Sequence, residues 1–308
     1  MRVTQQILFG NMMRDVNKNR SEMGKIQSDL SSGRTVRLPS HGPVEFQRSR
    51  IIEENLRKEV QYQDNISSGL RQSRMAQESL EETVDRLIDV KKLMVQGASS
   101  TTSEQVHQTI AQEIQGIRDT LINSLNVQSG DRYLFAGTNS SIRPFELVEY
   151  VEPVPPDPDE NPPGLVENNS NDKNPSVLVG DGITIDISIS GVELRDTGAG
   201  DLFEVLENVI TALEEGDSEA VNGLLGDIDL VVEHITNMTG KVATNINRMD
   251  FMFEQYEATR ISQKSQISDM IDTNYAQAFS DLQTNQIAYE AAMAVHSTMF
   301  SNTLLDYL

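Results

Sequence analysis

Apolar residues recur at alternating spacings of three and four near the amino end of the chain. The series runs Phe9, Met12, Val16, Asn19, Met23, Ile26 and Leu30, and Asn19 is its one polar member. Such a repeat places its members on one stripe of an amphipathic helix. The pattern predicts a helix from about Thr4 to Leu30, ended by Gly33, because glycine adopts the left-handed cap conformation without strain.

Two further helices are predicted after the turn at Pro39–Pro43. The same spacing continues from Ile52 to Met94, with Leu56, Ile66, Leu70, Leu80, Val84 and Leu87 on the stripe. The run Ser99–Ser103 interrupts the pattern, and Ser103 is a candidate N-cap for the next helix. That helix is expected to end near Leu125.

The prolines separate two helical tracts from a central insert. All ten lie at Pro39, at Pro43, or between Pro144 and Pro175. Because proline breaks helix interiors, the proline-free tracts 44–143 and 176–308 predict a helix–insert–helix order. Within the middle region, Tyr133-Leu134-Phe135 before Gly137 predicts a short strand and turn. The alternating series Ile183, Ile185, Ile187 and Ile189 is the clearest strand signal in the chain.

The carboxy-terminal tract repeats the pattern of the first helix. Helices restart at Asp201 and again at Ser218, a candidate N-cap. The spacing of three and four then holds through Ile271, Tyr275, Ala278, Leu282, Asn285, Tyr289, Ala292, His296 and Met299. We therefore expect a mainly α fold, in which both ends of the chain form a long antiparallel coiled coil or bundle and a small β-rich domain is inserted.

The spacing alone does not decide whether the two terminal stripes pack on each other or on other molecules. The sequence ends on Leu304-Leu305-Asp306-Tyr307-Leu308, whereas chain ends are usually polar and frayed. Only 5% of the residues are aromatic, so little bulk is available for a thick core. Both features favour assembly with partner subunits.

Charge and composition exclude several classes of function. The net charge is −22, which argues against nucleic-acid binding. No apolar run is long enough for a signal-peptide core or a membrane span. There is no cysteine, and the four histidines show no ligand spacing. A calcium-loop-like run at Asp157, Asp159 and Asn161 fails because Pro162 replaces the required glycine. We therefore predict no enzyme, and no catalytic, cofactor or metal site.

Several segments resemble one protein family. Leu30-Ser31-Ser32-Gly33-Arg34 and the stretch from Ala291 to Leu308 are similar to signature segments of the bacterial flagellin superfamily, as is Asp269–Ala276. The segment Asp131–Thr138 resembles a motif of its hook–filament junction branch, and the motif turn is carried by Arg132, Tyr133, Phe135 and Gly137. The chain departs from the family at Ser40-His41-Gly42-Pro43 and at Asp131.

The resemblance implies a domain organisation. It implies a terminal coiled-coil assembly domain (1–44 plus 269–308), a helical rod domain (45–138 plus 200–268) and a β-rich outer insert domain (139–199). The terminal helices would be disordered until they pack into the assembly. The expected interface residues are Phe9, Met12, Val16, Met23, Ile26, Leu30, Ile271, Tyr275, Leu282, Tyr289, Met299, Leu304, Leu305, Tyr307 and Leu308.

The resemblance also implies a role. The chain would be a secreted structural subunit at the hook–filament junction of the bacterial flagellum, exported without signal cleavage. Its partners would be another hook-associated protein, flagellin, an export chaperone and copies of itself in a ring. Alternatives are a minor flagellin that polymerises along the filament, a ligand-binding or enzymatic insert, and a helical scaffold unrelated to flagella.

Overall fold

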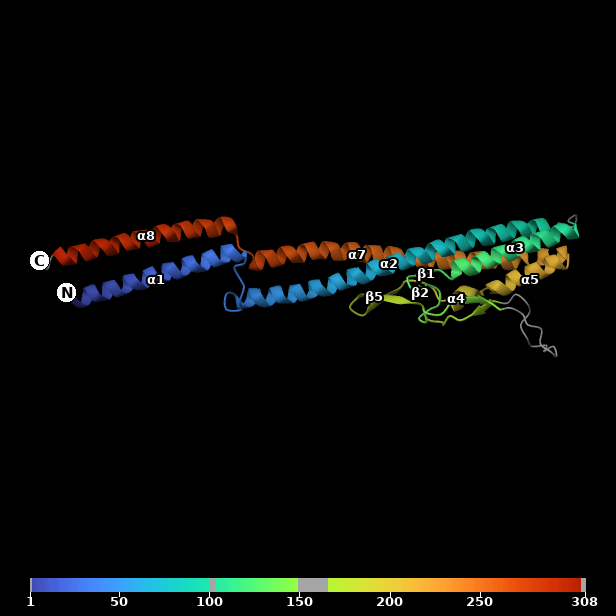
Figure 1. Cartoon of the computed structure of the whole chain (residues 1–308), viewed down its shortest axis with the longest axis horizontal. Coiled ribbons are helices and arrows are strands. Elements are labelled where there is room, and N and C mark those ends of the chain that lie inside the picture. Colours follow the sequence, from blue (N-terminus) through green and yellow to red (C-terminus); the bar gives the residue numbers. More distant parts are fainter. Residues whose placement is uncertain (1, 100–102, 149–165, 306–308) are drawn as a thin grey trace. The chain divides into compact units, whose positions relative to one another are not determined.

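The computed structural model describes residues 2–99, 103–148 and 166–305, and the side chains of residues 2–6, 8 and 296–305 are not described. The calcium-loop-like residues Asp157 to Asn161 lie outside the described residues. Helices dominate the described chain, as the apolar spacing predicts. Figure 1 shows their order along the sequence.

Eight helices and eight short strands are present in the described ranges. The helices are α1 (Arg2–Ser32), α2 (Pro43–Gly97), α3 (Glu104–Leu125), α4 (Gly191–Arg195), α5 (Leu202–Glu214), α6 (Ser218–Gly223), α7 (Leu225–Ile271) and α8 (Tyr275–Leu305). The strands pair as four antiparallel hairpin-like sheets: β1 (Gln128–Ser129) with β2 (Arg132–Tyr133), β3 (Phe145–Leu147) with β4 (Val166–Asn168), β5 (Ser176–Gly180) with β6 (Ile183–Asp186), and β7 (Asp196–Thr197) with β8 (Gly200–Asp201). None of the helices in these ranges is both long and apolar enough to span a membrane.

Local signals explain most helix ends. Gly33 has φ +71°, which ends α1 as predicted. The Asp201 carboxylate accepts hydrogen bonds from the amides of Phe203 and Glu204 and caps α5. The assignment of Ser218 as an N-cap was wrong, since the Asp217 carboxylate caps α6 instead. Ser103 does occupy the cap position of α3, but its hydroxyl makes no capping hydrogen bond.

The carboxy-terminal tract is interrupted where the spacing alone gives no warning. The residues Asp272, Thr273 and Asn274 separate α7 from α8 although the repeat of three and four runs through them. The Asn274 side chain accepts a hydrogen bond of 3.2 Å from the Gln277 amide, which is an N-cap contact for α8. An asparagine at this position was therefore an available signal for the break.

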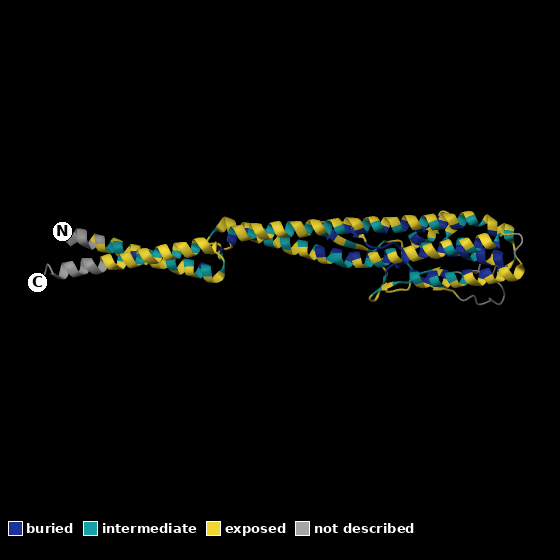
Figure 2. Cartoon of the chain, turned by 90° about the horizontal axis from the view of Figure 1, so that it is seen from above, coloured by how far each residue is buried: buried dark blue, intermediate teal, exposed yellow. Residues whose placement is uncertain are grey.

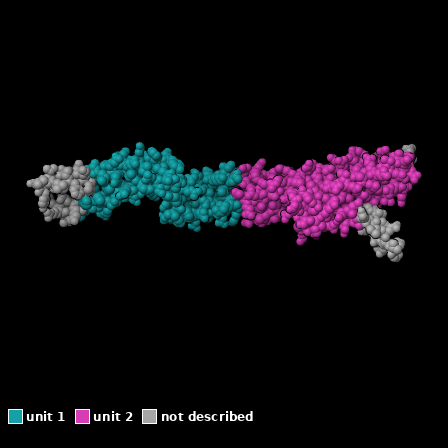
Figure 3. Space-filling view, in the orientation of Figure 1, with its two compact units in different colours: residues 1–58, 258–308 teal, residues 59–257 magenta. Residues whose placement is uncertain are grey.

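The chain divides into two compact units (Figure 3). Unit 1 comprises residues 1–58 and 258–308, and unit 2 comprises residues 59–257. The helices α2 and α7 each contribute residues to both. Figure 2 shows that exposed and half-buried residues dominate α1 and α8, whereas buried residues line the inner helix faces of unit 2.

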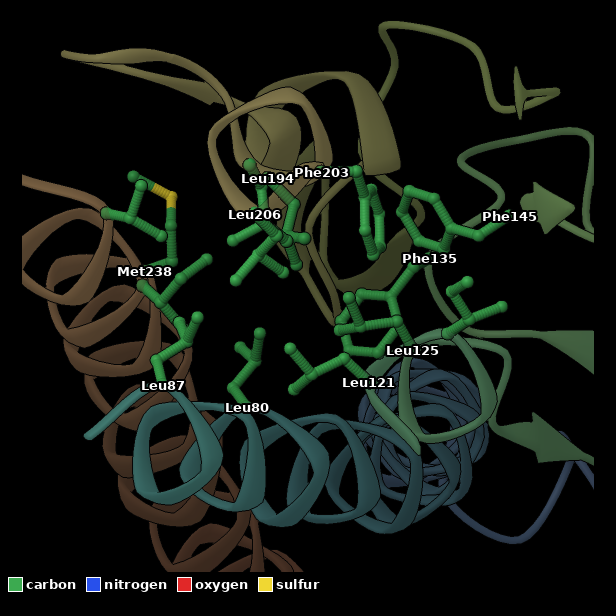
Figure 4. Packing of buried hydrophobic residues seen from close by; sticks show 14 of the residues in the cluster. Leu80, Leu87, Leu121, Leu125, Phe135, Phe145, Leu194, Phe203, Leu206 and Met238 are labelled. Carbon is green, nitrogen blue, oxygen red and sulfur yellow. The ribbon is translucent and has the colours of Figure 1, made fainter. Parts of the chain in front are cut away.

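Unit 2 contains the continuous apolar core. Side chains from α2, α3, α5 and α7 meet there, together with residues of the intervening loops (Figure 4). Leu80 and Leu87 come from α2, Leu121 and Leu125 from α3, and Phe203 from α5; all are almost inaccessible to solvent. The rings of Phe145 and Phe203 pack with centroids 5.6 Å apart, which fixes the insert against α5.

The hairpin of β5 and β6 lies over α2 and α7. Asn65 and Ser73 of α2 donate hydrogen bonds to the carbonyls of Leu178 (3.0 Å) and Ile187 (2.7 Å). From α7, Tyr256 donates to Val179 O at 2.8 Å. The strand predicted through Ile189 is shorter in the structure, because β6 ends at Asp186. Ile185, Ile187 and Ile189 are nevertheless buried, whereas Ile183 at the tip is exposed. Side-chain donors on both helices thus hold the hairpin in place.

We expect alkaline pH to loosen this hairpin through Tyr256. Burial raises the pKa of its hydroxyl above the ordinary value of 10.0, with Tyr62 and Glu59 adding to the effect. A raised pKa in the folded state means that the stabilisation is complete below pH 10 and is lost as pH rises through the folded-state pKa. The ionised hydroxyl can no longer donate to Val179 O. The protection of β5 amides against hydrogen exchange, relative to their intrinsic base-catalysed rates, should fall in that range, and Tyr256→Phe should remove this fall in protection.

Candidate assembly site

Helices α1 and α8 pack side by side in unit 1 (Figures 1 and 2). They run antiparallel, because the end of α1 meets the start of α8. Several residues of the predicted stripes are shielded in this helix pair. Val16 is 6% exposed, and Met12, Met23, Ile26, Leu30, Leu282 and Tyr289 are half-buried. The two stripes therefore cover each other within one chain. A role of these residues between copies stays a prediction.

Other predicted interface residues lie elsewhere. Phe9 is exposed. Ile271 is the last residue of α7 and is buried next to the non-helical residues Asp272–Asn274. Tyr275 is the first residue of α8 and is 58% exposed. The side chains of Met299, Leu304, Leu305, Tyr307 and Leu308 lie outside the described residues.

Sequence reasoning missed a second apolar surface on α8. Phe279 is 62% and Ile287 67% exposed, and Met293 and Val295 are exposed as well. These residues do not belong to the stripe that faces α1, so α8 is apolar on several sides. A helix that is apolar all round is normally buried on all sides. The spacing gave no clear signal of this surface, because polar Gln286 lies midway between Phe279 and Met293.

The segments Asp29–Arg37 and Ile271–Tyr275 meet and form what we call the joint. The Thr273 amide donates to Gly33 O at 2.9 Å, and the Thr35 amide donates to Ile271 O at 2.8 Å. The Thr273 hydroxyl donates to Asp29 O at 3.2 Å and lies 3.2 Å from the Thr35 hydroxyl. Two segments that are separated by 244 residues at Asp29 and Thr273 are therefore paired through their backbones.

The joint explains why glycine occupies position 33. Gly33 has a positive φ, and a Cβ added there would lie 2.9 Å from the Tyr275 hydroxyl oxygen. Asp29, buried within the joint, forms an ion pair of 3.0 Å with Arg37. Two of the segments that carried the family resemblance, Leu30–Arg34 and Asp269–Ala276, thus share one structural task, which is to hold the end of α1 against the start of α8.

Replacing Thr273 by valine should weaken the joint. Valine has the same shape but loses both hydroxyl contacts, at a cost of about 1–2 kcal/mol. Hydrogen exchange of the Thr35 and Thr273 amides should accelerate while that of unit 2 is unchanged. Thr284→Val is the matched control, because the Thr284 hydroxyl bonds only to Ser280 O of its own helix. Equal exchange rates in both variants would contradict a structural role for the joint.

The motif turn lies in unit 2 and anchors the insert. Leu134, Phe135 and Ala136 are buried, whereas Arg132 is exposed. The Gly191 amide donates to Phe135 O at 2.7 Å, and Gly137 adopts φ +70°. The Asn171 side chain makes two hydrogen bonds to Thr138, which follows Gly137. It accepts from the Thr138 amide (3.1 Å) and donates to the Thr138 hydroxyl (2.7 Å). The motif therefore joins the helices to the β-rich segment.

Polar side chains in unit 2 connect separate segments of the chain through hydrogen bonds. The Glu193 carboxylate lines a cavity of about 370 Å³ and accepts hydrogen bonds from Lys241 and Asn174. Burial raises the pKa of Glu193, but these bonds outweigh it and hold the pKa below its ordinary value. His107 bonds to Gly97 O and His234 to Glu193 O. Within the described residues, no group of three or more His, Asp or Glu side chains is placed to hold a metal ion.

Comparison with known proteins shows which proteins the chain is similar to. Residues 3–140 match the model of the bacterial flagellin N-terminal helical region. Over 97% of both chains, the sequence is 23% identical to flagellar hook-associated protein 3 of Escherichia coli strain K12. The chain is thus similar to the bacterial flagellin superfamily in its amino-terminal part and to flagellar hook-associated protein 3 over nearly its whole length. A second similar protein, flagellar hook-associated protein 3 of Salmonella typhimurium, is 20% identical over 99% of both chains.

Solved structures of the flagellin superfamily share the fold. A putative flagellar hook-associated protein from Vibrio parahaemolyticus aligns with TM-score 0.64 at 18% identity, covering 75% of this chain and all of that one. The flagellar junction protein FlgL from Legionella pneumophila aligns with TM-score 0.60 at 13% identity, covering 73% of this chain and 99% of that one. The family is a structural component of the flagellum.

Proposed function

We propose that this chain is the structural adaptor that joins a hook-associated protein to the flagellin filament. The observation that carries the proposal is the match, over nearly the whole length of both chains, to two proteins named flagellar hook-associated protein 3. The likeness of fold to a flagellar junction protein supports it. These relatives favour the junction over the alternative of a minor flagellin along the filament.

The charge distribution supports assembly through unit 1. Residues 59–257 contain 12 Lys and Arg against 36 Asp and Glu, whereas unit 1 contains 13 against 11. Like charges repel, so close approach of two copies through unit 2 is disfavoured. Unit 1 is nearly neutral and carries the exposed apolar residues of α8, whose burial would stabilise an assembly by about 25 cal/mol per Å².

In this proposal the chain is secreted through the flagellar export route with a chaperone, and its copies form a ring. The test is a clean deletion with complementation. Deletion should leave hooks that release flagellin into the medium, and immunogold against the restored protein should mark a band at the filament base. Normal filaments in the deletion strain would refute the adaptor role, and continuous labelling would establish the minor flagellin instead.

We expect the terminal helices to be loose in the free chain. Val16 is the single apolar side chain of α1, among those described, that is fully buried, and isolated helix pairs with little burial are marginal in water. Limited proteolysis of the monomer should therefore trim it to about residues 40–270. The same protease applied to assembled junctions should leave the ends intact. Equal resistance of monomer and assembly would contradict coupled folding.

A further inference from the structure

Helix α8 has an exposed surface that is apolar and carries only negative charge. Phe279, Ile287 and Met293 are exposed beyond the stripe that faces α1. Between Tyr275 and Leu305 there is no Lys or Arg, and the charged residues are Asp281 and Glu290. Glu290 is exposed and pairs with no basic group among the described residues. Such a surface is complementary to one that is partly apolar and positively charged.

Helix α1 offers a surface of that kind on the side away from α8. A second stripe with spacings of three and four comprises Ile7, Asn11, Arg14, Lys18, Ser21 and Lys25, all exposed. Each lies two positions from a residue of the buried stripe, which is about 200° around the helix. The stripe holds three basic residues and no acidic one. Lys18 lies 4.0 Å from Glu22, and Lys25 has no ion-pair partner among the described residues.

We propose that the outer face of α8 in one copy packs against the basic stripe of α1 in a second copy. This inference rests on the proposed function and specifies the contact between copies. A contact of α8 with α8 would bring acidic surfaces together, and a contact of α1 with α1 would bring basic surfaces together. The pairing of α1 with α8 is the combination in which the charges are complementary.

The contact is heterologous, because it joins two different surfaces. Each copy then keeps one free α1 stripe and one free α8 face, so further copies add in the same way. Such contacts close into rings or continue as helical arrays, whereas a contact of α8 with α8 ends at a dimer. The proposed ring of junction subunits requires the first geometry.

A charge exchange tests the contact. Self-association of the purified full-length chain is expected to order its terminal helices. Lys25→Glu or Glu290→Lys alone should weaken this self-association about threefold or more, and the two changes in one chain should restore it, since single exposed ion pairs contribute little but act specifically. Arg71→Glu with Glu233→Lys, exposed positions in unit 2, is the matched control and should have no effect. Singles that weaken association without recovery in the double variant would overturn the proposal.

Cross-linking tests the same contact in assembled flagella. The chain lacks cysteine, so Lys25→Cys and Glu290→Cys introduce the only thiols. A short bismaleimide should produce a ladder of multimers from the double variant and only monomers from each single variant. Dimers from Glu290→Cys alone, or no ladder at all, would overturn the proposal. If immunogold marks the junction but no ladder forms, this contact is refuted and the adaptor role is not. If a ladder forms but immunogold labels the chain along the whole filament, the adaptor role is refuted and this contact is not.

Discussion

Replacing Val16 by aspartate should abolish attachment of filaments to hooks. Val16 is 6% exposed in the contact between α1 and α8. Burying an ionised carboxylate without a partner costs several kcal/mol, which exceeds what a half-buried helix pair can supply. The pair should therefore stay apart, and the number of attached filaments should fall at least about tenfold, corresponding to 1.4 kcal/mol or more. Electron microscopy of complemented deletion cells measures this number.

The control for Val16→Asp is Asn17→Asp. It adds the same charge one residue away, at a position exposed to solvent. In both variants, the unfolding temperature of unit 2 should equal that of the wild type, because unit 2 contains neither residue. If Val16→Asp supported normal filaments, or if Asn17→Asp were equally defective, burial in the helix pair would not be the cause.

Replacing Gly137 by alanine should strongly destabilise unit 2. Its φ of +70° costs a residue with a Cβ about 1–2 kcal/mol. The added Cβ would also lie 2.8 Å from Lys173 O and 2.9 Å from Asn171 O, and closer still to the Asn171 side chain. Backbone oxygens cannot move aside as a flexible side chain can. We therefore expect a loss of more than about 2 kcal/mol, measured by denaturant unfolding.

Gly130→Ala separates the two causes. Gly130 has φ +65°, but a Cβ there would meet no atom within 4 Å. This variant should show the conformational cost alone, so the difference between the two variants measures the close approach of the Asn171–Lys173 segment. Equal losses would mean that the motif turn can shift away from that segment.

The sequence was sufficient for the helices because their signals are local. The spacing of three and four selected residues of α1 and α8 that are buried or half-buried in the structure, such as Val16 and Leu282. Gly33 and Asp201 marked helix ends through backbone geometry and capping that involve only near neighbours. The motif at Asp131–Thr138 indicated the turn at Gly137, but the predicted strand was misplaced, since β2 is Arg132–Tyr133 and does not include Leu134 and Phe135.

Other features depended on residues that are distant in the sequence. The break at Asp272–Asn274 exists because Thr273 bonds to Gly33 and Thr35 bonds to Ile271, and these contacts replace helical hydrogen bonds. Apolar spacing contains no information about such partners. The expectation of an uninterrupted stripe from Ile271 to Met299 was wrong for this reason, since Ile271 belongs to the joint.

By itself, the sequence determined that both ends are amphipathic helices and which stripe of each is apolar, because helix periodicity converts spacing directly into a face. Only the tertiary structure decided that these stripes cover each other within one chain. That pairing leaves a different surface of α8 exposed, with Phe279 and Ile287. The reason is physical: a periodic pattern defines which side chains share a face, but the residue that covers the face is set by packing between distant segments.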